Sequence, residues 1–498
     1  MVREILIHPY IFWIPTELIS RSPNRVGKFR VPVRFYGCAV QARGFAEAFV
    51  LAELTYANEH SVDAALTAGQ VSKMEVKTTM LGKEEEKVLK LIDEKELVNL
   101  ALAMGNITAP SGYEQPMADF VLQWLKENGF EKSYQQQLAE GRANTIGVLA
   151  GQGGGKNLIF NSHMDSEQGM ATRVGQELTP GPKAWLDEKG RIFGQAVQND
   201  RGPMAAFMIA TKAIKNSGIQ LRGDIIMTMV VGEIGMGPVD EFRGHRYIGK
   251  GYGSRHAVAH GVMGDFALVA ETTDFGVTWI EAGAAYFKVT LAGHGYYTPR
   301  LPERGPLKDH PNAIIKMAAV IQAIEKWAVE YEKKYTIEYP VGKMVPKVSI
   351  GAIRGGMPYK PSTSADSCSI YVDVRVPPPV DFAQVERELR KAVLSEGLGG
   401  EVECFMSRKG YEGKNVEPLV DAIRSAHETV RGTPPPPIDT PETSMWRDVN
   451  IFNEVGIPAA TFGMPRKSAP DVAQKFVEVR DIVDAAKMYA LVALKISS

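Results

Sequence analysis

Short apolar runs alternate with segments of helical spacing along most of the chain. The runs at 157–166, 225–231 and 266–273 are short, apolar and bounded by polar residues, which predicts three buried strands. Between the first two, the small-residue stretch after Asp200 predicts a helix start with Pro203 in its first turn. Strands and helices in this order predict an α/β domain with a mixed, largely parallel sheet flanked by helices.

The middle of the chain carries a different pattern. Residues 286–293 alternate between apolar and polar, as a half-buried strand does. Residues 382–394 have apolar positions at helical spacing, with Asp381 as the expected N-cap. Strand and helix signals resume from Pro418. We therefore expect an α+β domain inserted at 276–408, which splits the α/β domain into two segments of sequence.

The chain before this region has no comparable pattern. Residues 45–58 could form a helix, and the rest looks loop-like, so an extension of unclear role is expected, ahead of a true start at Met74 or Met80 or as part of the protein. The expected division is an N-terminal extension at 1–90, a catalytic domain in two parts at 91–275 and 409–498, and the inserted domain at 276–408.

Polar residues with metal-binding chemistry follow the predicted strands. His163 and Asp165 end the first predicted strand, Glu233 ends the second, and Glu271 ends the third. Asp200 lies between the first and the second strand. Each alone has an ordinary explanation, as a strand end or a helix cap. Because the carboxyl ends of parallel strands meet at one edge of a sheet, we expect these nitrogen and oxygen ligands to lie together.

Two smaller signals are interpreted as structural. His256 and His260 stand four residues apart, but no Glu follows His256, so they are expected to be surface residues rather than metal ligands. The glycine-rich run 151–156 lacks the spacing of a phosphate-binding loop and has no Ser or Thr after its lysine. It is expected to be a flexible hairpin turn.

Composition narrows the class of protein. The 498 residues are 44% hydrophobic and 23% charged, ordinary for a soluble globular enzyme. A formal net charge of -1 provides no basic field for nucleic acid or an anionic membrane. No apolar run approaches a membrane span, and the start is a poor signal peptide. Cys38, Cys368 and Cys404 are far apart and cannot all pair, which suits a reducing cytoplasm.

Taken in order, these motifs resemble the cocatalytic zinc exopeptidases and deacylases typified by carboxypeptidase G, acetylornithine deacetylase and succinyl-diaminopimelate desuccinylase. The resemblance runs from about Glu96 to the C-terminus. It implies a zinc-exopeptidase-like sheet with an inserted lid and dimerisation domain, and therefore a homo-oligomer. It also implies that His163, Asp200 and Glu271 hold a metal ion, with Asp165 as the partner that orients His163.

Two departures from the family pattern change the expected chemistry. Gly232 stands where the family has its general base, and Ser468 stands where it has the last histidine ligand of a second metal. The second site then keeps at best Asp200 and Glu233, so we expect one divalent transition metal, Zn or Mn. Such an ion would lower the pKa of bound water toward about 7 and generate hydroxide. Glu233 would be free to carry the proton, unless it helps to hold a weak second ion.

Aromatic and basic residues replace small or polar ones at several family positions. Together they predict a site that stacks a flat ring and pairs with a carboxylate, whereas each alone is better explained by packing or a surface charge. For His294 and Tyr297, a surface hairpin loop is an equal alternative. The predicted substrate-binding residues are His294, Tyr297, Arg354, Tyr359, Trp446 and Arg447.

These features predict a metal-dependent hydrolase that cleaves a C–N bond of a small carboxylated, aromatic substrate. One divergent activity of this superfamily, the hydrolytic deamination of 5-nitroanthranilate, fits a mononuclear site with an aromatic lining. Two alternatives stay open: an N-acyl amino acid deacylase or metallo-exopeptidase, and a catalytically inactive binding protein. A small-molecule substrate is expected as the partner, without nucleic acid or membrane.

Overall fold

The computed structural model describes residues 81–167, 183–438, 440–469 and 474–498, together with four short strands near the N-terminus. The chain forms two units, Met1–Lys77 and Thr78–Ser498. The helix expected at 45–58 lies outside the described residues. The first unit contains two antiparallel strand pairs, β1 (Val2–Ile7) with β2 (Tyr10–Pro15) and β3 (Val33–Phe35) with β4 (Cys38–Val40).

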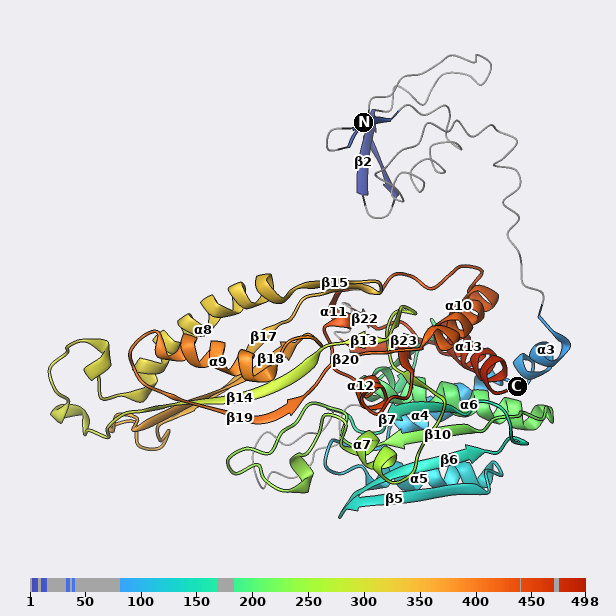
Figure 1. The fold of residues 1–498 in the computed structure, drawn as a ribbon, viewed down its shortest axis with the longest axis horizontal. Coiled ribbons are helices and arrows are strands. Elements are labelled where there is room, and N and C mark those ends of the chain that lie inside the picture. The colour runs from blue at the N-terminus through green and yellow to red at the C-terminus, as the bar shows by residue number, and fades with distance from the viewer. Residues whose placement is uncertain are drawn as a thin grey trace. The chain divides into compact units, whose positions relative to one another are not determined.

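A seven-stranded sheet forms the centre of the second unit, in the order β12-β21-β11-β7-β10-β6-β5 (Figure 1). The four central strands β21, β11, β7 and β10 are parallel, and β12, β6 and β5 add antiparallel edges. The strand bounds are β5 (Lys132–Ala139), β6 (Arg142–Leu149), β7 (Leu158–His163), β10 (Ile225–Val230), β11 (Phe266–Ala270), β12 (Val277–Thr278) and β21 (Ala459–Phe462).

Helices cover both faces of this sheet because its strands are apolar on both sides. Leu158 and Phe160 of β7 pack into the larger core, whereas Ile159 between them packs into a second core on the opposite face. Helices α4 (Glu94–Gly105), α5 (Gln115–Glu127), α6 (Gly202–Ser217), α10 (Glu417–Arg431) and α13 (Val479–Ser497) supply the larger core, and α7 (Tyr252–Ala259) and α12 (Val449–Glu454) the second. The predicted fold class is confirmed.

Helix α3 (Lys83–Leu89) lies within the range expected for the N-terminal extension. Its Val88 is fully buried in the larger core, and α3 contacts α6 and α13. The unit that carries the catalytic sheet therefore begins at Thr78, before the expected boundary at residue 91.

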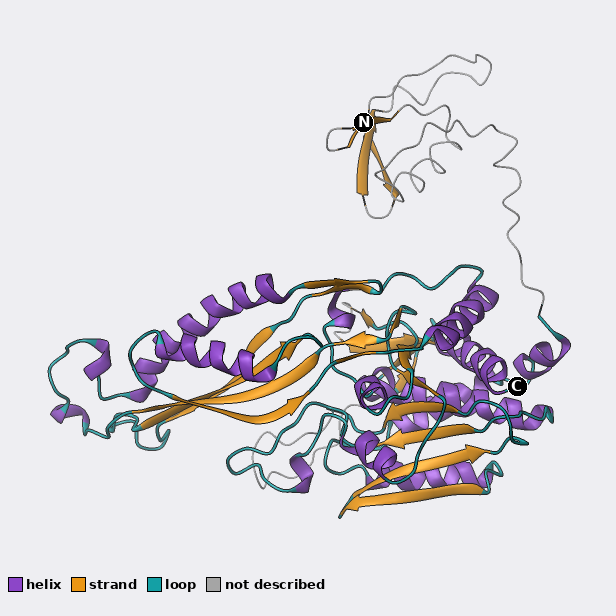
Figure 2. Ribbon diagram, viewed as in Figure 1, coloured by secondary structure: helices purple, strands orange, loops and turns teal. Residues whose placement is uncertain are grey.

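The inserted segment forms a lid built on a four-stranded antiparallel sheet in the order β17-β18-β14-β19. Two helices pack on one face of this sheet, and their apolar residues form a separate core with it (Figure 2). The bounds are β14 (Gly283–Ala292), α8 (Ala313–Tyr335), β17 (Val348–Gly355), β18 (Ser367–Val376), α9 (Phe382–Leu394) and β19 (Glu401–Arg408). Helix α9 and its Asp381 cap, which accepts from the Ala383 N–H at 3.1 Å, match the prediction.

Short elements complete the second unit. The chain leaves for the lid and returns from it along one antiparallel pair, β13 (Ile280–Glu281) with β20 (Tyr411–Glu412). The remaining elements are β8 (Trp185–Leu186), β9 (Arg191–Phe193), β15 (Ile337–Tyr339), β16 (Gly342–Met344), α11 (Thr440–Thr443), β22 (Lys467–Ala469), β23 (Gln474–Glu478), the π-helical turn η2 (Val197–Arg201), and the 3-10 turns η3 (His245–Tyr247), η4 (Thr298–Arg300) and η5 (Leu307–Asp309).

The glycine-rich run 151–156 is not a hairpin turn. It connects β6 to β7, and these strands are not neighbours because β10 lies between them. The prediction was wrong because β7 is a central strand with parallel neighbours on both sides, so the chain must cross over β10 to reach it. Among the described helices, none has the length and apolarity needed to cross a membrane.

Candidate metal centre and active site

Three parallel strands end at one edge of the sheet and bring the predicted residues together. The register pairs Val230 of β10 with His163 at the end of β7, and β11 runs alongside β7 on its other side. Glu233 and Glu271 follow the ends of β10 and β11. Asp200 comes from η2, immediately before helix α6. The sheet register therefore explains why residues more than a hundred positions apart share one site.

His163, Asp200 and Glu271 form a buried cluster of possible metal ligands. One ligand atom from each lies within 4.8 Å of the other two, and His163 Nε2 is 3.8 Å from a Glu271 oxygen. His163 Nε2 and Asp200 Oδ1 are buried without a hydrogen-bond partner among the described residues. Burying such groups unpaired is costly, and the carboxylates repel one another. A divalent ion that takes nitrogen and oxygen ligands would remove both costs, so the residues fit a metal.

The directions of the pKa shifts in the cluster agree with a cation site. Burial, and then the negative charge of Glu271, raise the pKa of Asp200 well above its ordinary value. For His163, burial acts in the opposite direction, but Asp165 and the surrounding carboxylates raise its pKa well above the usual range. Protons on these groups substitute for the positive charge that a metal would supply, because the cluster needs cations of some kind to offset its carboxylates.

Asp165 orients His163 and the segment that carries Glu233. His163 Nδ1 is 2.9 Å from the Asp165 carbonyl oxygen and 3.5 Å from its carboxylate. That carboxylate accepts from Ser111 Oγ at 2.7 Å and from the backbone N–H groups of Glu233 and Ile234 at 3.2 and 3.1 Å. Burial opposes ionisation, but the hydrogen bonds from His163 and Ser111 hold the pKa of Asp165 well below its usual range. Asp165 is thus a fixed anion that leaves Nε2 free for a metal.

Glu233 lies beside the three-residue cluster. Its Oε2 is 3.9 Å from His163 Nε2, and its carboxylate makes no hydrogen bond with the described residues. Burial raises its pKa, against the lowering effect of the Lys250 and His163 charges. A buried carboxylate with a raised pKa and unused oxygens next to a metal cluster is suited to accept and return a proton.

Gly232 and Ser468, the two positions that depart from the family pattern, differ in their surroundings. Gly232 has φ of 66°, and a Cβ there would lie 2.6 Å from Arg142 Nη2. Arg142 is itself fixed by a buried ion pair with Glu114, at 2.6 Å. The position therefore has no room for a catalytic side chain. Ser468 lies on β22 with an exposed side chain.

Arg447 is engaged within the protein. It is 3% exposed, its Nε is 3.5 Å from Glu271 Oε2, and its Nη1 donates to Glu281 Oε1 at 3.0 Å. Nη2 donates to Glu442. Arg447 thus pairs with the candidate metal ligand Glu271 and shares its charge with two further carboxylates, Glu281 and Glu442. Its predicted contact with a substrate carboxylate stays a prediction.

Trp446 and Asp448 form another part of the same buried region. Trp446 is 2% exposed, and its indole Nε1 is unpaired among the described residues. Lys250 Nζ lies 5.2 Å from the centre of its ring. Asp448 accepts from Ser254 Oγ at 2.6 Å, and burial, then the charge of Glu233, raise its pKa to about 8.

The lid residues predicted to bind substrate lie away from the cluster. Arg354 pairs with Glu241, in the loop after β10, and its guanidinium lies 4.9 Å from the Phe242 ring centre. His294, Tyr297 and Tyr359 are exposed, the last two at 57% and 86%. The loops that carry them, 293–312 and 356–366, are at the end of the lid farthest from the catalytic sheet (Figure 1). This chain does not bring them to its own metal cluster.

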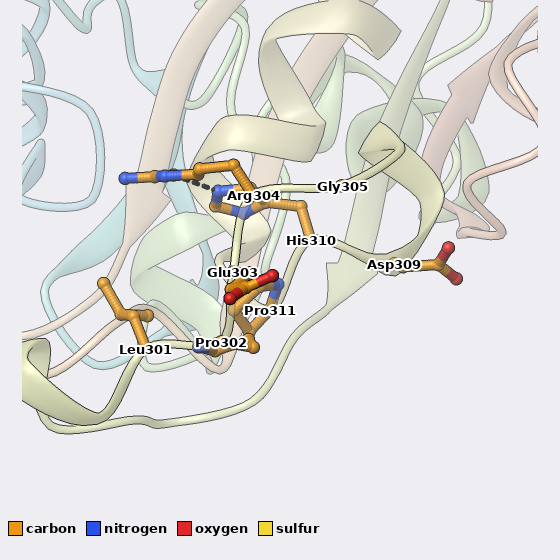
Figure 3. Close-up of a pocket in the computed structure, with 8 residues that line it drawn as sticks. All are labelled: Leu301, Pro302, Glu303, Arg304, Gly305, Asp309, His310 and Pro311. Atoms are coloured by element: carbon orange, nitrogen blue, oxygen red, sulfur yellow. Dashed lines mark hydrogen bonds between the residues drawn. The ribbon is translucent and has the colours of Figure 1, made fainter.

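A small hollow of about 150 Å³ lies in the first of these loops (Figure 3). Residues 301–305 and 309–311 line it, and Arg304 donates to His310 Nε2 at 2.6 Å. Because it shares the far end of the lid, this hollow is separate from the metal cluster.

Sequence reasoning missed three buried charged residues: Lys250 beside Glu233, and Glu281 and Glu442 around Arg447. Lys250 carries one weak signal, its position between Gly249 and Gly251. Glu281 and Glu442 carry none, because their role depends on how the fold brings β13 and α11, which are distant in sequence, together around Arg447.

Comparison with known proteins places this geometry in a family. Residues 159–495 match the profile of Peptidase family M20/M25/M40. The chain is 24% identical over 311 residues to N-formyl-4-amino-5-aminomethyl-2-methylpyrimidine deformylase from Bacillus subtilis, covering 60% of this chain and 67% of that protein. It is also 24% identical over 322 residues to aminoacylase-1 from Dictyostelium discoideum, covering 61% and 70%.

The fold has matches among solved structures as well. The dipeptidase Dug1p from Saccharomyces cerevisiae superposes with a TM-score of 0.60 at 15% identity, covering 83% of this chain and 98% of that one. The predicted family resemblance and the assignment as a hydrolase of that family are confirmed. Since the matched segment spans well over half of its length, this chain belongs to Peptidase family M20/M25/M40.

Proposed function

We propose that the chain is a metal-dependent amidohydrolase that cleaves the C–N bond of a small carboxylated substrate. One observation carries the proposal: a buried cluster whose ligand atoms His163 Nε2 and Asp200 Oδ1 have no hydrogen-bond partner among the described residues, with the Glu233 carboxylate 3.9 Å from His163 Nε2. A cluster of this kind is expensive to maintain in an inactive protein, because each buried unpaired group costs stability.

His163, Asp200 and Glu271 would hold one divalent ion, Zn or Mn. When bound, such an ion polarises a carbonyl oxygen and lowers the pKa of water. Three protein ligands leave a position for substrate or water, as in catalytic zinc sites. A single ion is favoured over two because the position of the family's last histidine is the exposed hydroxyl of Ser468, a poor ligand for such ions.

Glu233 would carry the proton from the attacking water to the leaving nitrogen. As the water oxygen adds to the carbonyl carbon, the water gives a proton to the Glu233 carboxylate, which passes it to the leaving nitrogen when the C–N bond breaks. Its hydrogen-bond-free oxygens and raised pKa suit both transfers. Asp165 would hold the His163 ring and, through the backbone N–H of Glu233, the base itself.

Two relatives support an amide substrate other than an ordinary peptide. One is named as a deformylase of an N-formyl aminopyrimidine and the other as an aminoacylase. A second candidate is hydrolytic deamination of an aromatic amine such as 5-nitroanthranilate, which the buried indole of Trp446 favours because aromatic side chains stack on flat rings. The candidates differ in product, a carboxylic acid with an amine in one case and ammonia in the other.

A combined measurement of metal content and products tests the proposal. Purified protein is loaded with Zn or Mn, metal per chain is determined by elemental analysis, and N-formyl and N-acetyl aromatic amino acids and aminobenzoates are offered as substrates. About one equivalent of metal with released formate or acetate supports the amidohydrolase. Ammonia release supports the second candidate. Two equivalents would favour a cocatalytic site, and a metal-free chain without turnover would favour a binding protein.

Association with a second copy through the lid is also proposed. Strand β17 is an edge strand, and its Ile353 is 54% exposed, while Ile314 and Ile315 of the neighbouring helix are 40% and 45% exposed. Exposed apolar edges of this kind tend to pair with another chain. Light scattering on the purified protein should give twice the chain mass, and replacing Ile353 with Lys should lower the measured mass.

A cytoplasmic location is likewise a proposal, supported by the free Cys368 and Cys404.

A further inference from the structure

Lys250 is held in a tight and unfavourable backbone conformation. Its φ is 51°, in the left-handed region that non-glycine residues rarely adopt. The chain around it is closely packed, since a Cβ on Gly249 would lie 2.2 Å from the Ile234 carbonyl oxygen and one on Gly251 would lie 2.7 Å from the Trp446 ring. Strain of this kind persists where the surroundings fix a residue for a purpose, so the placement of Lys250 calls for an explanation.

The ammonium of Lys250 is buried without a paired carboxylate. The residue is 6% exposed, and its Nζ makes no hydrogen bond or ion pair with the described residues. Its Nζ lies 5.2 Å from the centre of the Trp446 ring. Burial lowers its pKa, and the negative charge of Glu233 opposes this effect. A buried cation with three unused donors is costly, and an anionic ligand would offset that cost.

Other unused donors lie in the same neighbourhood. A Cβ on Gly235 would lie 3.3 Å from Lys250 Nζ and 2.3 Å from the Tyr286 hydroxyl, so both groups converge on this glycine. The Tyr286 hydroxyl has no hydrogen bond within the described residues, and the Trp446 Nε1 is buried and unpaired there too. Gly235 is two residues from Glu233. These donors therefore lie next to the proposed proton carrier.

Three other cations of the same unit are already paired with carboxylates. Arg447 is shared by three carboxylates, Arg354 pairs with Glu241, and Lys288 of the lid pairs with Asp240. Lys250 differs from these three because its Nζ, beside the Trp446 ring and the unpaired donors, has no ion pair among the described residues, although the negative charges of Glu233, Asp373 and Asp448 act on it from beyond ion-pair distance. A carboxylate on a flat ring would match this combination, with its oxygens on the donors and its ring against the indole.

We propose that Lys250, together with Trp446 and the Tyr286 hydroxyl, binds the carboxylate of the substrate and selects flat, anionic substrates. The inference rests on the proposed function, since it names the substrate class of the same site. In the competing explanation, Lys250 only balances the charge of Glu233 and touches no ligand.

Calorimetric binding to the metal-loaded protein separates these explanations without turnover. The probes are benzoate and its neutral analogue benzamide, tested on the wild type, on Lys250→Met and on the matched control Lys288→Met. The proposal expects benzoate affinity to fall at least about tenfold in Lys250→Met, the cost of losing a hydrogen bond to a charged group, with benzamide affinity and the control unchanged. Equal loss for both probes, unchanged benzoate affinity, or no benzoate binding to the wild type would overturn it.

A second variant keeps the test decisive if Lys250→Met does not fold. Tyr286→Phe removes one hydroxyl and should weaken benzoate by about twofold to tenfold, with benzamide less affected. Unchanged benzoate affinity in this folded variant would count against the site. Metal content and turnover are measured on the same samples, so a protein that binds benzoate through Lys250 but hydrolyses no substrate would refute the proposed function and leave the binding site standing.

Discussion

The edge of the catalytic sheet and the far end of the lid differ in how they hold their predicted site residues. At the sheet edge, His163, Asp200 and Glu271 are buried within 4.8 Å of one another. In the lid, Tyr297 and Tyr359 are exposed, and the loops that carry them lie at the end of the lid farthest from the catalytic sheet (Figure 1). Parallel strands fix where their carboxyl ends lie, whereas a lid loop gains its neighbours from how domains or copies meet.

The difference between the two regions shows which contacts one chain can make alone. The candidate metal ligands His163, Asp200 and Glu271 all come from one copy, as do the carboxylates paired with Arg447. The lid loops 293–312 and 356–366, in contrast, do not reach the candidate metal ligands within the described part of this chain. Their contribution to a site, if the proposed second copy forms, depends on association rather than on the fold of one chain.

Removing a ligand is expected to have the largest effect. His163→Ala should lower metal affinity by more than about a hundredfold and abolish turnover, because even changes behind metal ligands cost 10–100-fold. Elemental analysis after dialysis and a turnover assay measure both. His294→Ala, at the far end of the lid, is the matched control and should keep its metal. Retention of metal by His163→Ala would show that the cluster is not the binding site.

Glu233→Gln should separate proton transfer from metal binding. The amide cannot accept a proton, so kcat should fall by about 10²–10⁴-fold while the metal content stays unchanged. The exposed Glu403→Gln on the lid serves as the control for a lost carboxylate. If metal is lost together with activity, Glu233 is a metal ligand, and the proposal of a one-metal centre with Glu233 as a separate base is wrong.

Arg447→Met should destabilise the protein strongly. It leaves Glu271, Glu281 and Glu442 buried without their shared cation, a change that typically costs about 3–5 kcal/mol. Denaturant unfolding of the wild type and the variant measures the difference, and metal content reports on Glu271. A loss below about 1 kcal/mol, with weaker substrate binding instead, would return Arg447 to the substrate-binding role predicted from sequence.

How far the sequence could predict the site follows from these contrasts. The strand ends at His163, Glu233 and Glu271 could be predicted because a short apolar run followed by a polar residue has one interpretation in a parallel sheet. The partners of Arg447 could not, because Glu281 precedes the lid on β13 whereas Glu442 lies in α11, beyond helix α10, and no local pattern links them. Lys250 was missed for the same reason, since its meaning depends on the indole of Trp446.

The stability of the Arg447 network should depend on pH. Burial raises the pKa of Glu281 to about 7, against the opposing charge of Arg447, and its Oε2 is unpaired among the described residues. Because the folded pKa lies above the ordinary 4.5, the folded state holds the proton more tightly, and this contribution is lost as pH rises from about 4.5 through 7. The loss should be up to about 3 kcal/mol.

Glu281→Gln isolates this effect from other titrating groups. The unfolding free energy of the variant should fall less than that of the wild type between pH 5 and pH 8, as measured by denaturant titration at each pH. Parallel pH profiles for the two proteins would show that Glu281 is ionised in the folded state throughout this range and that Arg447 neutralises it fully.

Arg354→Met should have the smallest effect and completes the comparison. Arg354 and Glu241 are both exposed, at 41% and 47% of their side chains, and exposed ion pairs contribute about 0–1 kcal/mol. Unfolding free energy should therefore change by less than about 1 kcal/mol, against the much larger loss in Arg447→Met. If the residue serves a substrate in an associated second copy, KM measured above the association concentration should rise while stability stays the same. A large stability loss would instead mean that the pair fastens the loop after β10 to the lid, so that the lid and the catalytic segment of Glu233 move together.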